Sequence, residues 1–177
     1  MHDLGFVSAI LADYTFEEVI KIAKEEKFKC VEMMCWPKGQ AERRYAGVTH
    51  IDVDHLDQST IASIHQTLTE ADIYISALGY YPNPLDPDDD KASFYRAHIK
   101  KVIAAAKQLG ITKVNTFIGR NPSLNIDDNI KLFKIKMFLQ LHKKLFTNFE
   151  IVIETIFRIL CIKNFFIIKF LNFKNGF

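Results

Sequence analysis

The sequence lacks the features of several specialised classes of protein. It has only three cysteines, Cys30, Cys35 and Cys161, an odd number without regular spacing, which argues against a disulfide framework. No G-x-G-x-x-G motif follows an apolar run, so a nucleotide-binding fingerprint is absent. Charged residues interrupt every apolar window of about twenty residues, which argues against a membrane span. We therefore expect a cytoplasmic protein with free thiols.

Charge is distributed unevenly along the chain. Residues 1–130 carry 14 Lys and Arg against 19 Asp and Glu, whereas residues 131–177 carry 9 against 2. Residues 156–177 contain no acid and consist almost wholly of Ile, Phe, Leu, Lys and Asn. This composition resembles out-of-frame or drifting translation of an AT-rich gene, so we expect residues 155–177 to be an atypical, non-native tail. The amino terminus shows neither a basic region nor a long apolar core, so no secretory signal is expected.

Short apolar runs alternate with amphipathic helical patterns along the rest of the chain. The runs predict strands over residues 4–10, 30–36, 74–79, 113–118 and 149–153. Helix-capping residues predict helices that begin after Thr15, after Asp57, near Asp89 and near Asn125. Strands that alternate with helices of this length are typical of a parallel α/β sheet, whose strands are buried on both faces. A closed eight-stranded barrel needs about 250 residues, so a barrel would be incomplete here.

Ligands of parallel α/β folds bind where the strands end at their carboxyl side. That rule selects the candidate functional residues: Ser8, Trp36, Tyr80, Tyr81, Asn83, Asn115, Thr116 and Glu154.

Other polar residues have structural explanations. The close spacing of His50, Asp52, Asp54 and His55 could suggest a metal cluster, but neighbouring loop residues of this kind more often form turns and caps. Glu32 needs a polar partner if it is buried, and Arg43 or Lys113 could supply one. His98 lies beside an apolar helical stripe and is expected to pack.

Five segments give the sequence a family resemblance. They comprise residues 4–8, 31–33, 46–54, 78–87, with the motif Leu78-Gly79-Tyr80-Tyr81-Pro82-Asn83-Pro84, and 114–120. In this order they resemble the xylose-isomerase-like family of sugar phosphate isomerases and epimerases. The resemblance implies a (β/α)8 TIM barrel that is incomplete, with four to five βα units over residues 1–154.

The resemblance also implies a chemistry and a site. Members hold one divalent metal, usually Mn, Mg or Co, with carboxylates and a histidine at the ends of strands five to eight. Glu154, after Ile151-Val152-Ile153, matches the strand-five glutamate, and the resemblance makes it a metal ligand and a catalytic residue. The implied reaction is metal-assisted proton transfer next to a carbonyl through an enediolate. The residues implied to bind a small sugar or sugar phosphate are Trp36, Tyr80, Tyr81, Asn83 and Asn115.

The sequence departs from this pattern after Glu154. Thr155-Ile156-Phe157 stands where Asn-Cys-Pro is usual, and the ligands of strands six to eight have no counterpart. We therefore expect weak or absent metal binding and an isomerase that is inactive through truncation. No nucleic-acid partner is expected. Two alternatives stay open: a barrel-type metal-dependent endonuclease relative, and a non-catalytic fragment that associates, as a homo-oligomer, through its open sheet edges.

Overall fold

A single parallel sheet forms the centre of the molecule. The computed structural model describes residues 3–39, 46–138 and 150–154. Its five strands pair in chain order, each parallel to the next. They are β1 Gly5–Val7, β2 Cys30–Met34, β3 Tyr74–Gly79, β4 Lys113–Phe117 and β5 Glu150–Glu154. The predicted parallel sheet is therefore confirmed, and the predicted tail at 155–177 lies outside the described residues.

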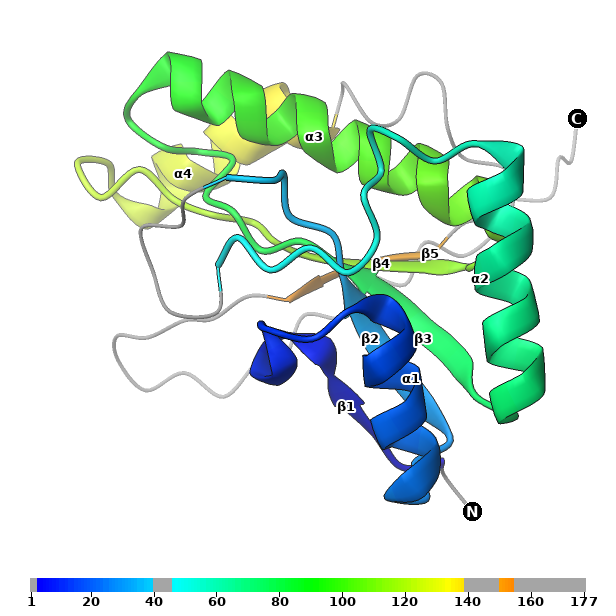
Figure 1. Ribbon diagram of the computed structural model, residues 1–177. Coiled ribbons are helices and arrows are strands. Elements are labelled where there is room, and N and C mark those ends of the chain that lie inside the picture. The colour runs from blue at the N-terminus through cyan, green and yellow to red at the C-terminus, as the bar shows by residue number, and fades with distance from the viewer. Residues whose placement is uncertain (1–2, 40–45, 139–149, 155–177) are drawn as a thin grey trace, which may run out of the picture.

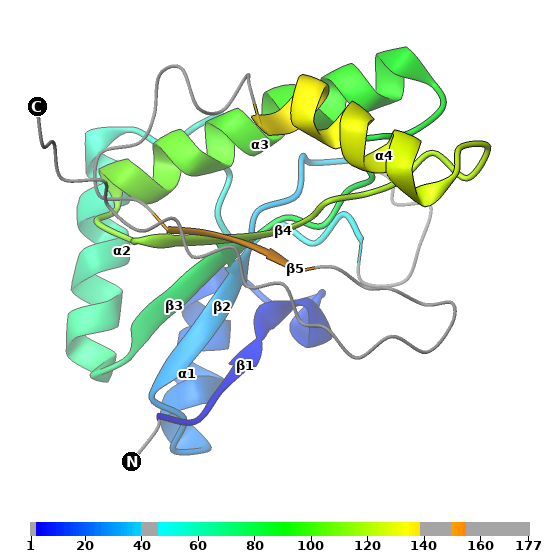
Figure 2. The same cartoon turned by 180° about the vertical axis from the view of Figure 1, so that it is seen from behind.

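Helices join consecutive strands and cover one side of the sheet. They are α1 Phe16–Glu25, α2 Gln58–Ala71, α3 Asp89–Gln108 and α4 Ile126–Phe133, with a short 3₁₀ turn at Ser8–Leu11 and a π turn at Lys134–Phe138. Figures 1 and 2 show the helices around the outer face of the curved sheet. This arrangement is the incomplete (β/α) barrel that the sequence predicts. None of the helices in the described part of the chain is long and apolar enough to cross a membrane.

The helix starts follow the capping residues. Thr15 and Glu18 form a capping box, in which the Glu18 N–H donates to Thr15 Oγ1 at 3.2 Å and the Thr15 N–H to Glu18 Oε2 at 2.7 Å. Asp57, Asp88 and Asn125 cap the next three helices by accepting backbone N–H groups in the first turn. These contacts are local in sequence, which is why the helix starts were predictable.

The main core lies between the helices and the outer face. Its fully buried members come mainly from the strands and from one stripe each of α1 and α3, among them Val19, Ile20, Val31, Met33, Leu78, Ile99, Val102, Ile103 and Val114. From α2, Ile61 and Ile64 pack against them. Cys35 belongs to the same core, and Cys30 is also buried; both are free thiols, as expected.

An irregularity in β3 decides which residues lie on the inner face of the sheet. Val31 pairs with Ile75, but Glu32 pairs with Ala77, so Ser76 is an extra residue in β3. Beyond this bulge the alternation shifts by one, because side chains of a strand point to alternate faces. Leu78 and Tyr80 consequently join the outer core, whereas Gly79 and Tyr81 lie on the inner face.

Replacement of Gly5 by alanine tests the pairing of β1 with β2. A Cβ at this position would lie 2.5 Å from the Cys30 carbonyl oxygen and 2.5 Å from its Sγ, so the strands would have to separate. We expect Gly5→Ala to lower the free energy of unfolding by about 1–3 kcal/mol in urea denaturation. Leu4→Ala is the matched control, since Leu4 is 68% exposed, and should change it by less than about 0.5 kcal/mol. Equal effects of the two substitutions would contradict the described pairing.

Candidate functional site

Two consecutive tyrosines leave the carboxyl end of β3 toward opposite faces of the sheet. Tyr80 is fully buried on the outer face, with its ring 4.9 Å from Trp36 and 4.7 Å from His98. Tyr81 lies on the inner face, 4.8 Å from the ring of Phe117. The sequence grouped both tyrosines in one substrate site, but the structure separates them.

A carboxylate forms the centre of the inner face. Glu32 is half-buried on β2, and its Oε1 accepts a hydrogen bond from the Tyr81 hydroxyl. Its Oε2 accepts one from Asn115 Nδ2 at 2.6 Å. Gly79 provides the space, because a Cβ there would lie 2.6 Å from Glu32 Oε1. We call Glu32, Tyr81 and Asn115 the inner cluster; it links three neighbouring strands.

The inner cluster gives the Glu32 carboxylate two hydrogen-bond donors that the sequence did not suggest. Of the two partners suggested, Lys113 is not one of these donors, and Arg43 lies outside the described residues, so that suggestion stays a prediction. Tyr81 and Asn115 are 49 and 83 residues from Glu32, so no local pattern could have identified them.

The last described strand brings Glu154 to the same end of the sheet. In the parallel register of β4 and β5, Asn115 pairs with Val152 and Phe117 pairs with Glu154. Glu154 thus ends β5 at the carboxyl side of the sheet, where the sequence placed it. Its roles as metal ligand and catalytic residue stay predictions.

A serine–histidine pair joins the first strand to the loop after β2. Ser8 Oγ lies 2.9 Å from His50 Nδ1 and accepts the Met34 N–H at 3.0 Å, while His50 Nε2 lies 3.1 Å from the Leu11 carbonyl oxygen. Burial lowers the pKa of His50, which favours the neutral ring. Nε2 then donates to Leu11, and the Ser8 hydroxyl donates to Nδ1. Ser8 is fully buried, so this hydrogen bond has a structural role: it connects two segments that lie 42 residues apart in the sequence.

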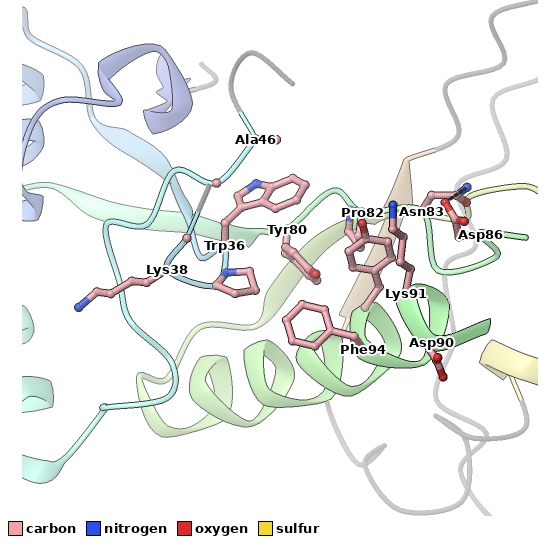
Figure 3. A pocket seen from close by; sticks show the side chains of 14 residues that line it. Trp36, Lys38, Ala46, Tyr80, Pro82, Asn83, Asp86, Asp90, Lys91 and Phe94 are labelled. Atoms are coloured by element: carbon pink, nitrogen blue, oxygen red, sulfur yellow. Dashed lines mark hydrogen bonds between the residues drawn. The ribbon is translucent and has the colours of Figure 1, made fainter. Parts of the chain in front are cut away.

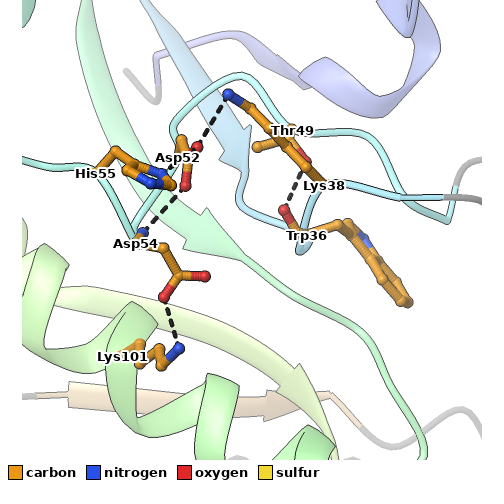
Figure 4. A network of polar contacts seen from close by, with 7 residues as sticks. All are labelled: Trp36, Lys38, Thr49, Asp52, Asp54, His55 and Lys101. Atoms are coloured by element: carbon orange, nitrogen blue, oxygen red, sulfur yellow. Dashed lines mark hydrogen bonds and ion pairs between the residues drawn. The ribbon is translucent and has the colours of Figure 1, made fainter.

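The acidic loop after β2 forms ion pairs rather than a metal cluster. Asp52 Oδ2 lies 2.9 Å from Lys38 Nζ and 2.9 Å from His55 Nδ1, and Asp54 pairs with Lys101 at 2.6 Å (Figure 4). Burial raises the pKa of Asp52, but the hydrogen bonds from Lys38 and His55 outweigh it and hold the pKa at about 2. Among the described residues, no three His, Cys, Asp or Glu side chains could together hold a metal ion.

A pocket of about 670 Å³ opens on the other side of β3, between the carboxyl ends of β2 and β3 and the first half of α3 (Figure 3). Trp36, Tyr80 and Asn83 line it. Asn83 also fixes the loop after β4, since its Nδ2 donates to the Arg120 carbonyl at 2.9 Å and its Oδ1 accepts the Arg120 N–H at 2.8 Å. The five predicted substrate residues therefore divide between this pocket and the inner cluster, and their role in substrate binding stays a prediction.

Comparison with solved structures finds the same fold in longer proteins. The chain superposes on the IolI protein with a bound zinc atom at a TM-score of 0.59 and 12% identity, covering 87% of this chain and 51% of that one. It superposes on the probable 3-DHS dehydratase AsbF of Bacillus anthracis at 0.60 and 13%, covering 86% and 52%. A D-psicose 3-epimerase, in the presence of D-fructose, gives 0.47 and 13%, covering 65% and 37%. At these identities the likeness shows the fold alone.

Sequence comparison identifies the family. The chain spans about half the length of the first two structures. None of the curated proteins matches it in sequence. A family model described as the xylose isomerase-like TIM barrel matches residues 20–158, which is most of the chain. Together with the parallel βα succession, this match confirms the resemblance, and the chain belongs to the xylose isomerase-like TIM barrel family.

Proposed function

We propose that the chain binds a sugar or sugar phosphate on the inner face of its barrel, as part of an enzyme that isomerises or epimerises it. The observation that carries the proposal is the inner cluster, in which two donors hold the Glu32 carboxylate. Interior positions of such barrels are ordinarily filled by packed branched apolar side chains. A hydrogen-bonded carboxylate in that place favours a polar ligand above it.

Glu32 serves as a positioning residue in this proposal. Both of its oxygens accept hydrogen bonds, so it fixes the orientation of the Tyr81 hydroxyl and the Asn115 amide. An asparagine side chain has a second N–H and a carbonyl oxygen, and a tyrosine hydroxyl can also accept. Sugar hydroxyls both donate and accept, so these oriented groups suit them. Because the Tyr81 and Asn115 side chains are already ordered in the free protein, ligand binding loses less conformational entropy, which raises the affinity.

Glu154 is the proposed base. Aldose–ketose isomerisation removes a proton from the carbon next to the carbonyl and passes through an enediolate. In the enediolate the hydroxyl proton of that carbon moves to the former carbonyl oxygen, and the first proton returns to the former carbonyl carbon. A single carboxylate can accept the proton and give it back. Epimerisation needs a second acid on the opposite side of the carbon. The register that pairs Glu154 with Phe117, beyond the Asn115–Val152 pair, supports this assignment.

The described residues do not form the metal site that the family resemblance implies. No three potential ligands come together among them. Both Glu32 oxygens are engaged by Tyr81 and Asn115, which leaves Glu154 as the carboxylate that matches a family ligand. Hard divalent cations take about six oxygen ligands. Further ligands would have to come from outside the described residues, and no step above passes through a cation.

Titration with D-fructose tests the proposed sugar site. We expect the side-chain amide signals of Asn115 to shift saturably in NMR spectra, because this amide would contact sugar oxygens. Asn115→Ala should weaken binding about threefold to tenfold, the value of one or two neutral hydrogen bonds. Gln108→Ala, which removes an exposed amide at the end of α3, should leave the affinity unchanged. Failure of fructose to shift the Asn115 signals would contradict the proposal.

Glu32→Gln tests the positioning role within the same titration. The new amide N–H₂ would face one of the two donors, so that donor would lose its acceptor. We expect the free energy of unfolding to fall by about 1–3 kcal/mol and fructose affinity to fall with it. Unchanged stability together with unchanged affinity would show that the carboxylate does not organise the site.

A manganese titration tests the metal assignment. One family-type carboxylate holds such a cation loosely, so we expect millimolar or weaker affinity for Mn²⁺, little changed by Glu154→Gln. Isothermal calorimetry measures both. Tight binding that this substitution abolishes would show that a complete site assembles, for example between two chains, and would make the expectation of weak binding wrong.

A further inference from the structure

The pocket beside α3 contains two buried polar groups that the protein does not satisfy. Tyr80 Oη and Trp36 Nε1 have no hydrogen-bond partner among the described residues; Thr116 Oγ1 is the third such atom and does not line the pocket. Buried polar groups are nearly always paired, so each exception calls for an explanation. Burial raises the pKa of Tyr80, so its hydroxyl stays protonated. The indole N–H is a donor only, so both groups call for acceptor atoms.

The same pocket presents flat aromatic surfaces. Trp36 and Tyr80 stand edge to face, and Phe94 on α3 faces them across the pocket (Figure 3). Phe94 is 56% exposed, which is high for a large apolar side chain that packing alone would bury. Figure 3 shows the Tyr80 hydroxyl directed toward the space between Phe94 and Lys91. A ring could therefore lie against Phe94 while its oxygens meet the hydroxyl.

Charge around the pocket favours a neutral occupant. Two lysines and two aspartates line it, Lys38, Lys91, Asp86 and Asp90, so the signs balance. Lys38 is bound to Asp52 at 2.9 Å and extends away from the rings. The nearby start of α3 is capped by Asp88 and carries Asp89 and Asp90 in its first turn, which already occupy the positive end of the helix dipole. An anion would find no unopposed positive charge here.

We propose that this pocket binds a neutral, ring-shaped small molecule with hydrogen-bond acceptor oxygens, to which Tyr80 donates and on which Phe94 stacks. The site is separate from the inner cluster, because Tyr80 and Tyr81 leave β3 toward opposite faces. The volume of about 670 Å³ lies within the usual range for small-molecule pockets. Neutral sugars and oxygenated aromatic rings share this chemistry.

Trp36 makes the proposal directly measurable, since it is the single tryptophan of the chain. Its one indole N–H signal in NMR spectra reports on the pocket. The full chain is titrated with methyl β-D-glucopyranoside, with para-methoxyphenol, and with glucose monophosphate as the anionic comparison. We expect at least one neutral probe to shift the indole signal saturably and to bind more tightly than the phosphate. If the glucoside binds, the natural ligand is a neutral sugar; if para-methoxyphenol binds, it is an oxygenated aromatic ring.

Variants of the pocket residues show whether a probe binds at this specific site or makes unspecific contact. Tyr80→Phe removes only an unpartnered hydroxyl, so thermal unfolding should be unchanged while probe affinity falls about fivefold to tenfold. Phe94→Ala should weaken binding similarly, and Tyr14→Phe, at a tyrosine that is 47% exposed elsewhere, should not change it. Three results would each overturn the proposal: no shift with either neutral probe, affinity indifferent to Tyr80→Phe, or tighter binding of the phosphate. None of these results bears on fructose binding at Asn115, so the two sites are tested independently.

Discussion

The hydrogen-bonded carboxylate of Glu32 constrains the inner face of the sheet. A charged group can remain half-buried there only if its oxygens are satisfied, because an unpaired charge is costly away from water. Asn115 satisfies it from β4 and Tyr81 from the segment that follows β3, and these bonds require all three strands to keep their register. Gly79 follows from the same constraint, since any larger residue would meet the carboxylate. One carboxylate thus determines the identity and position of its neighbours.

The bulge at Ser76 makes that arrangement possible. Without the extra residue, β3 would continue its earlier alternation and place Tyr80 on the inner face and Tyr81 in the outer core. With it, Tyr81 reaches Glu32 and Tyr80 packs against His98. A shift of one residue therefore decides which tyrosine can contact a ligand inside the barrel. The separation of two neighbouring aromatic residues into two sites is a direct consequence.

Sequence reasoning predicted the elements well and the site only in part. Helix starts at Thr15 and Asp57 depend on contacts within three residues, and the span of β3 appears as an apolar run, so both are visible locally. The bulge is not visible, because nothing in the run Ile75-Ser76-Ala77-Leu78 marks Ser76 as a residue without a partner on β2. Partners of Glu32, and the tie between Ser8 and His50, join segments far apart in the chain. Only the fold brings such residues together, so the candidate site could be listed from the sequence but not assembled.

Main-chain bonds fix the two sites relative to one another. The Tyr80 N–H donates to the Asn115 carbonyl at 3.0 Å, so the backbone of a pocket residue is bound to the backbone of an inner-cluster residue. On the other side, the Cys35 N–H donates to the Gly79 carbonyl at 3.0 Å, and the Cys35 carbonyl accepts from His98 Nε2 at 2.8 Å. Sheet hydrogen bonds of this kind leave little freedom for one site to move without the other. The two sites therefore keep a fixed distance and orientation relative to one another, and the side chains decide what each accepts.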